Sequence, residues 1–143
     1  MVIFSLILAM TASASFAADG GSGTEPKLRS THLPSISSIM IRNSGTTSPI
    51  EGISREQCTN FKLSYQEIQA YIGNASEVAE HDYFHMLDWS PCHASGEITF
   101  KNGITGRWAI GQYRAGSLKL SNGRTLYLYC PRCQAQAFPP VDK

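Results

Sequence analysis

The sequence predicts an α+β domain in which a short helix packs on a four-stranded antiparallel meander, stapled by disulfides. Three observations carry this prediction. A helix-start signal precedes apolar residues at helical spacing, and alternating apolar residues separated by Asn-Gly pairs indicate successive hairpins. Four cysteines follow an N-terminal export signal, and an even number of cysteines in an exported chain is typical of structural disulfides.

The N-terminus has the pattern of an export signal. An apolar run at 2–10 is followed by small residues, and Ala17 offers a signal-peptidase site, so we expect a signal peptide at 1–17. No Lys or Arg precedes the apolar run, which departs from the usual pattern. The run is much shorter than the ~20 residues that a bilayer requires, so no membrane span is expected.

A segment rich in Ser, Thr, Gly and Pro comes next, and we expect a flexible leader at 18–55. Apolar residues gather only at 36–41, which is either one short edge strand or part of a disordered leader. The ordered α+β domain is predicted at 56–138, with a tail at 139–143.

The first ordered element is predicted to be a helix over 65–73. Ser64 and Glu67 form a capping box, in which each side chain accepts a hydrogen bond from an unpaired amide of the first turn. Apolar residues then recur at helical spacing, and Gly73 or Asn74 can supply a left-handed stop.

The second half of the chain alternates between apolar and polar residues. Asn102-Gly103 and Asn122-Gly123 are the strongest short-range hairpin signals. The segment 75–88 fits neither a helical nor a strand period, so a helix and a loop followed by a strand both remain open. The predicted strands are 96–101, 104–112, 116–121 and 124–130.

Strand counting bears on the cysteines. Four up-and-down strands return the chain to the end where it began, so Cys92 is predicted near Cys130 and Cys133. Four cysteines allow three pairings. If the sheet curls, the favoured pairings join Cys58 and Cys92 each to one of the two C-terminal cysteines.

The C-terminal pair lies in the motif Cys130-Pro131-Arg132-Cys133, which has two further interpretations. Thiol–disulfide oxidoreductases use Cys-Pro-x-Cys, but they place it at a helix N-terminus, and this chain has no βαβ pattern around it. A zinc site would need two more ligands, such as Cys58, Cys92 or His93. Structural disulfides are the leading interpretation.

A second candidate for metal binding is the pair His81 and His85. The two side chains share one face if the segment is helical, and Glu80 or Asp88 could add a carboxylate. The metalloprotease motif His-Glu-x-x-His is absent from the sequence, and such a pair is commonly a solvated surface face.

The predicted binding surface lies on the last strand and its neighbours. Tyr127 and Tyr129 point away from the apolar face of that strand, and Arg107 and Arg124 lie nearby in the predicted sheet. Tyr and Arg dominate binding hot spots, although Tyr is also tolerated in cross-strand pairs on an ordinary solvent face. The tryptophans are expected to be packed, with Trp108 under the helix and Trp89 at the entry to the first strand, and the alternative for Trp89 is an exposed aromatic side chain that meets a partner.

Charge and motifs exclude several classes of function. The formal net charge is +1 without clustered Lys or Arg, so nucleic acid is not an expected partner. The sequence has no glycine-rich phosphate loop and no nucleophile-elbow motif, so no catalytic residue is predicted. No cofactor is expected unless the cysteines or histidines bind zinc.

The segments Asp88-Trp89-Ser90-Pro91-Cys92, Gly106-Arg107-Trp108-x-Ile110 and Tyr129-Cys130-Pro131-x-Cys133 resemble small exported bacterial proteins of uncharacterised type. The resemblance covers residues 58–138. It implies export and a compact domain, and it carries over no catalytic residue.

The sequence therefore predicts a periplasmic or secreted, non-enzymatic domain that binds another protein, with inhibitors and immunity factors as the narrower class suggested by size and compartment. The alternatives are a metal-binding protein that uses Cys130 and Cys133 or His81 and His85, and a small thiol-redox enzyme.

Overall fold

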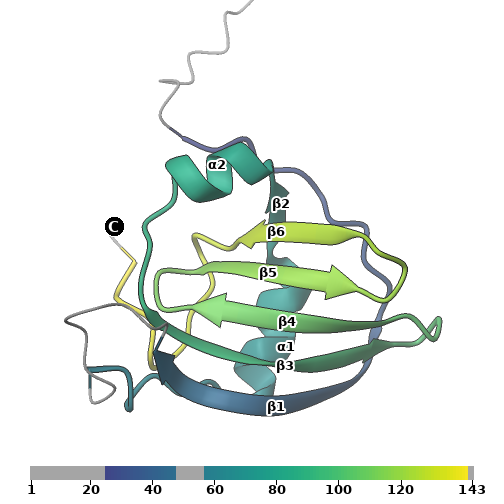
Figure 1. Ribbon diagram of the computed structural model, residues 1–143, viewed down its shortest axis with the longest axis horizontal. Coiled ribbons are helices and arrows are strands. Elements are labelled where there is room, and N and C mark those ends of the chain that lie inside the picture. Colours follow the sequence, from purple (N-terminus) through teal and green to yellow (C-terminus); the bar gives the residue numbers. More distant parts are fainter. Residues whose placement is uncertain (1–24, 48–56, 142–143) are drawn as a thin grey trace, which may run out of the picture.

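The computed structural model describes residues 25–47 and 57–141. The predicted signal peptide at 1–17 lies outside these residues. Within them, six strands form one antiparallel sheet in the order β1-β3-β4-β5-β6-β2, with α1 against one face (Figure 1). The elements are β1 (Ile36–Thr47), α1 (Tyr65–Asn74), β2 (Ser76–Val78), α2 (Glu80–His85), β3 (Cys92–Phe100), β4 (Thr105–Gly111), β5 (Ala115–Leu120) and β6 (Thr125–Tyr129).

Helix α1 begins at the predicted capping box. The Ser64 Oγ accepts a hydrogen bond from the Glu67 amide at 3.1 Å, and the Glu67 carboxylate accepts one from the Ser64 amide at 2.9 Å. The predicted left-handed stop is wrong. The helix ends at Asn74, and Ala75, the residue that caps it, has an extended conformation. The Asn74 side chain instead donates to the Ala70 carbonyl at 2.7 Å, which satisfies one of the last carbonyl groups.

The four-stranded meander is confirmed as β3 to β6. Its two Asn-Gly turns share one geometry, in which only the glycine is left-handed, with φ of 87° at Gly103 and 90° at Gly123. Each asparagine side-chain oxygen accepts from the amide two residues later, at 3.1 Å for Asn102 and 3.0 Å for Asn122. The hairpins are thus closed by a turn followed by a glycine bulge rather than by a two-residue loop.

Strand β1 confirms the alternative of an edge strand at 36–41 and corrects the expectation of a flexible leader at 18–55 for the part that the strand covers. Residues 36–47 form a long edge strand that pairs with β3, and Ile36, Ile39 and Ile41 pack against the core. The pairing register shifts between Ile36 and Ser38 and again between Ile41 and Asn43. Each such irregularity moves the following side chains to the other face of the sheet. The sequence of this strand therefore lacks the regular alternation of apolar and polar residues that indicates a strand.

The ambiguous segment 75–88 contains two short elements. β2 pairs with β6 at the opposite edge of the sheet from β1, and α2 follows after one residue. α2 has no side-chain cap at its N-terminus and no buried residue of its own. The described residues therefore form a mostly-β fold with a six-stranded sheet and two short helices, in place of the predicted single helix on four strands.

The core lies between α1 and the sheet. Ile68, Tyr71 and Ile72 of α1 pack on a continuous apolar face that includes Trp108, which is 1% exposed. The Trp108 ring nitrogen donates to the Glu97 carbonyl at 3.1 Å, so the prediction of a core tryptophan is confirmed. We call the opposite face of the sheet, which α1 does not cover, the outer face.

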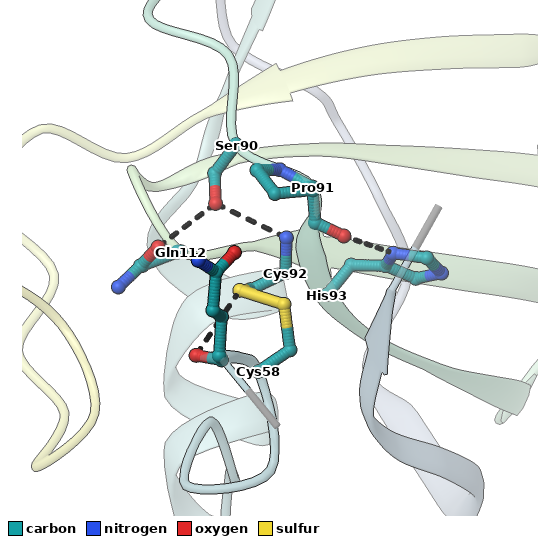
Figure 2. Close-up of a disulfide and its surroundings, with 7 residues drawn as sticks. Cys58, Ser90, Pro91, Cys92, His93 and Gln112 are labelled. Carbon is teal, nitrogen blue, oxygen red and sulfur yellow. Dashed lines mark hydrogen bonds between the residues drawn. A yellow bond between two sulfur atoms is a disulfide. The ribbon is translucent and has the colours of Figure 1, made fainter. Parts of the chain in front are cut away.

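The favoured disulfide pairings are wrong. Cys58 bonds to Cys92 (Figure 2), and Cys130 bonds to Cys133. Cys92 and Cys130 do lie at the same end of the sheet, since both flank the β4–β5 turn through backbone hydrogen bonds to Gln112 and Arg114. However, the sheet stays open, and β4 and β5 separate β3 from β6, so the two cysteines do not meet.

Candidate functional site

The outer face has a floor of small side chains at the end nearest the β4–β5 turn. Gly111 lies opposite His93 in the β3–β4 pair, and Ala109 lies opposite both Ser95 and Ser117. Alternation places these residues opposite the buried core positions of the same strands. Small side chains leave the backbone of β4 and β5 close to the surface.

Aromatic side chains surround this floor. Tyr83 and Phe84 come from α2, Trp89 from the segment before β3, and Tyr113 from the β4–β5 turn. Together with the floor they line a hollow of about 370 Å³, which we call the aromatic groove. In Figure 1, α2 and the segment that leads to β3 border one end of the sheet, where this groove lies.

Three of these side chains are largely accessible to solvent. Phe84 is 61% exposed, Trp89 is 60% exposed and Tyr113 is 41% exposed. Burial of an aromatic side chain on folding or binding contributes about 1.5–3 kcal/mol. These three side chains therefore expose apolar surface that a binding partner could bury. The expectation that Trp89 is packed is wrong.

The position of α2 depends on Tyr127 of β6. The ring of Tyr127 lies 4.9 Å from that of Tyr83 and 5.5 Å from that of Phe84, measured between centroids. Its hydroxyl donates to the Glu80 carboxylate at 3.3 Å. Desolvation and then the Glu80 carboxylate raise the pKa of Tyr127, and desolvation and then Tyr127 raise that of Tyr83. Both phenols therefore stay neutral at physiological pH.

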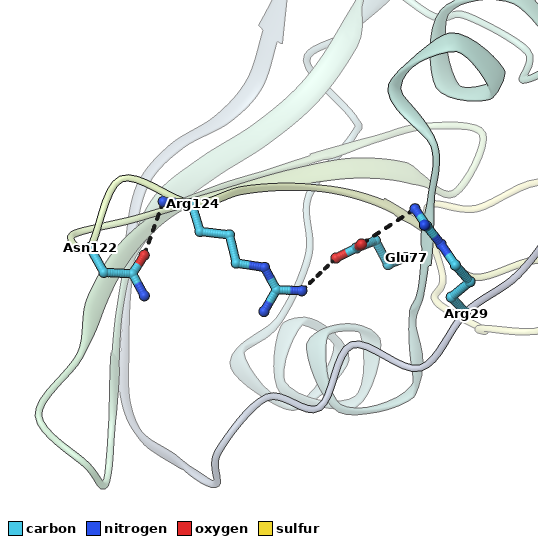
Figure 3. A network of polar contacts seen from close by, with 4 residues as sticks. All are labelled: Arg29, Glu77, Asn122 and Arg124. Atoms are coloured by element: carbon cyan, nitrogen blue, oxygen red, sulfur yellow. Dashed lines mark hydrogen bonds and ion pairs between the residues drawn. The ribbon is translucent and has the colours of Figure 1, made fainter.

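The predicted binding residues have separate roles in the structure. Tyr127 and Tyr129 lie half-buried on the same outward side of β6, as alternation predicts, but Tyr127 supports α2. Arg124 donates to Glu77 at 2.9 Å, and Arg29 lies 3.4 Å from the same carboxylate (Figure 3). The two ion pairs of Glu77 connect β2 to the segment before β1 and to the turn before β6. Arg124 is therefore a structural residue.

Arg107 remains exposed on the outer face, at the end opposite the aromatic groove. It lies across from Glu97 on β3 and Lys119 on β5. The fourth predicted residue is thus on the expected face but belongs to a different hollow from that of the aromatic side chains.

Sequence reasoning missed Tyr83 and Phe84 as site residues, and for Trp89 it favoured packing over the alternative of exposure to a partner. The segment that contains them has several large apolar residues without helical or strand period. Apolar residues at helical or alternating spacing lie on one face of an element and can be buried together. Several apolar residues without such spacing cannot all lie on one buried face, so some of them are expected to be exposed. That signal was present in the sequence.

The histidine pair is brought together as predicted. The rings of His81 and His85 lie 4.5 Å apart between centroids on α2, and His81 lies 3.6 Å from Asp82. Zinc and similar ions take four ligands, of which this pair would supply two. Within residues 25–47 and 57–141, no group of three His, Cys, Asp or Glu residues is arranged to hold a metal ion.

The C-terminal cysteine motif forms a covalent turn. Cys130 and Cys133 are bonded to each other, and the Cys133 amide donates to the Cys130 carbonyl at 3.2 Å. In the described part of the chain, turns rather than a helix follow Cys130. The helix N-terminus that activates the first cysteine of an oxidoreductase is therefore missing from the described residues here, and bonded sulfur atoms do not act as zinc thiolates.

The side chains near Cys92 have hydrogen bonds that are structural. The Ser90 hydroxyl donates to the Gln112 side chain at 2.8 Å and accepts from the Cys92 amide at 3.1 Å (Figure 2). His93 approaches the Pro91 carbonyl at 3.4 Å rather than the Ser90 hydroxyl. Ser90 and His93 line the groove without forming a nucleophile–base pair.

No helix in the described residues is long and apolar enough to cross a membrane. No family model, curated protein or solved structure matches this chain.

Proposed function

We propose that this chain is an exported, non-enzymatic domain that binds another protein through the aromatic groove. One observation carries the proposal: Phe84, Trp89 and Tyr113 are exposed around a hollow with a floor of small residues. Aromatic side chains that are rigid and only partly covered are the common anchors of protein interfaces.

Two features of the groove favour binding over catalysis. The hydrogen bonds of Ser90 hold the start of β3 in place, and His93 is directed to a backbone carbonyl. The rings of Tyr83 and Tyr127 are packed against each other and hold α2 in position over the sheet. A surface fixed in this way loses little conformational entropy when a partner binds.

The cysteines support the proposed compartment. All four are in disulfides, which persist in oxidising compartments and are rare in the cytosol. We therefore propose a location outside the cytoplasm, in the periplasm or secreted. Within the binding class, an inhibitor or immunity-type role fits a small domain with a rigid, exposed aromatic surface.

Affinity capture with matched variants tests this proposal. We expect the double variant Trp89→Ala, Tyr113→Ala to lose capture of the partner by more than about 30-fold, which corresponds to the loss of a hot spot. Tyr65 of α1 is 55% exposed and lies away from the groove, so Tyr65→Ala is the matched control and should retain capture. Equal capture by both variants, with unchanged circular dichroism, would refute the groove as the binding surface.

A further inference from the structure

The outer face has a second hollow at the end of the sheet opposite the aromatic groove. It has a volume of about 550 Å³ and lies beside the turns at Gly103 and Gly123. Arg107 of β4, Lys119 of β5 and Glu97 of β3 are the charged residues that line it, and the others are uncharged. We call Arg107 and Lys119 the basic pair.

The basic pair consists of like charges held directly opposite each other. Arg107 and Lys119 are cross-strand partners in the β4–β5 ladder. Like charges in that arrangement destabilise a sheet. Arg107 also faces Glu97 of β3, but the Glu97 carboxylate accepts a hydrogen bond from Arg42 of β1 at 3.1 Å.

The basic pair has no ionic partner within the described residues. The ion pairs there join Glu77 to two arginines, Glu97 to Arg42, and His81 to Asp82. This part of the outer face therefore presents three cations, on Arg42, Arg107 and Lys119, against the one carboxylate of Glu97. An unpaired like-charge pair in a hollow is suited to an anion of the partner.

Resting on the proposed function, we propose that the partner contributes an extended acidic segment. A bulky apolar side chain of that segment occupies the aromatic groove, and its carboxylates pair with Arg107 and Lys119. Arg107 and Gly111 lie on the same strand and both face outward. At about 3.3 Å per residue they are separated by roughly 13 Å, so an extended ligand places the first acidic residue roughly four positions from the anchor.

Charge complementarity selects this occupant over a second copy of the chain. A copy docked by the same face with its two-fold axis near the basic pair would place its own Arg107 and Lys119 against those of the first molecule. Like charges in that position disfavour the interface. A partner with carboxylates at that position gains attraction there and associates faster at low salt.

The test uses two synthetic peptides and the full exported chain labelled with ¹⁵N. The acidic peptide is acetyl-Trp-Ser-Thr-Ser-Glu-Glu-amide, and the basic peptide has Lys in place of both Glu residues. Each is also made in the reverse order, because the direction of the segment is open. We expect the acidic peptide to shift the amide signals of Gly111 and Arg107, with an affinity more than about tenfold above that of the basic peptide.

Charge reversal supplies the decisive comparison. The double variant Arg107→Glu, Lys119→Glu should reverse the preference between the two peptides. Lys62→Glu, Arg132→Glu changes the net charge equally at exposed positions elsewhere and should leave the preference intact. The amide spectrum of each variant reports whether the fold is unchanged.

The outcomes separate the two proposals. If both peptides bind at the groove with equal affinity, the acidic-segment inference is wrong and the groove remains a binding site. If neither peptide shifts any groove signal, the acidic-segment inference is wrong, and affinity capture with the Trp89→Ala, Tyr113→Ala variant decides whether the groove binds a partner in another way. Self-association through the outer face, or binding of anionic phospholipid vesicles but not the acidic peptide, would also overturn the inference.

Discussion

Arg114 shows how much one side chain can hold together. It adopts a left-handed conformation with φ of 71° in the β4–β5 turn, where glycine would be less strained. Its side chain donates to the carbonyl groups of Cys133, at 2.8 Å, and Pro139, and it lies 5.2 Å from the centre of the Phe138 ring. The strain is offset because Arg114 fastens the C-terminal segment beside the turn that carries Tyr113.

Gly96 of β3 is required by close packing rather than by its backbone angles. A Cβ atom there would lie 1.9 Å from the Met40 carbonyl oxygen and 2.8 Å from the Trp108 ring. We expect Gly96→Ala to destabilise the protein by about 3 kcal/mol, because β1 or Trp108 must move. Urea unfolding measures this difference.

The control for that substitution is Gly73 in α1, where an added Cβ meets no atom within 4 Å. Gly73→Ala should stabilise the helix by about 0.5–1 kcal/mol. Equal effects of the two substitutions would show that β1 does not approach β3 as closely as described.

At the scale of elements, α1 depends on a buried tyrosine. The Tyr71 hydroxyl donates to the Arg114 carbonyl at 2.7 Å, and desolvation, with smaller contributions from Tyr83 and Tyr129, raises the pKa of Tyr71 well above its usual value. Unfolding returns the phenol to a pKa of about 10. The unfolded chain therefore binds fewer protons above about pH 10, and the free energy of unfolding falls as the pH rises through that range.

Tyr71→Phe isolates this contribution. The variant loses one hydrogen bond, which we expect to cost about 1 kcal/mol at neutral pH. Its stability should then fall less steeply than that of the wild type above about pH 10. Urea unfolding between about pH 8 and pH 11 makes the comparison. Parallel curves for the two proteins would show that Tyr71 is not the buried phenol responsible.

The elements differ in how far the sequence predicts them. The capping box and Asn-Gly pairs are local signals, and α1 and the meander follow from them. β1 was left as one of two alternatives because its register shifts break the alternation, and α2 likewise because six residues without a cap give too little periodic pattern. Tyr127 could be assigned to the outer face from alternation, but its role in holding α2 required knowledge of the helix.

At the scale of the whole molecule, the two disulfides act differently. Cys58–Cys92 closes a loop with a sequence separation of 34 and joins the segment before α1 to the start of β3. On the chain-entropy model it contributes about 4 kcal/mol, against about 2 kcal/mol for the separation of three in Cys130–Cys133. The pairing was mispredicted because it depends on whether the sheet curls, and that is decided by β1 covering the free edge of β3.

The outer face of the sheet contains both hollows described above. The core side of the sheet is buried under α1, while the outer side has the aromatic groove at one end and the basic pair at the other. Both hollows lie along β4 and β5, so an extended partner segment can follow the strands from one to the other. The proposed binding surface thus runs along the length of these two strands.

Site-specific photo-crosslinking tests the claim of a partner at the aromatic groove most directly. A benzophenone amino acid replaces Tyr113 in the full chain, within the cells that produce it, and replaces Tyr65 in the control. We expect a covalent adduct with one defined protein from position 113, which is absent from position 65 and lost when Trp89→Ala is added. The same adducts from both positions, or an adduct at 113 that persists without Trp89, would contradict it.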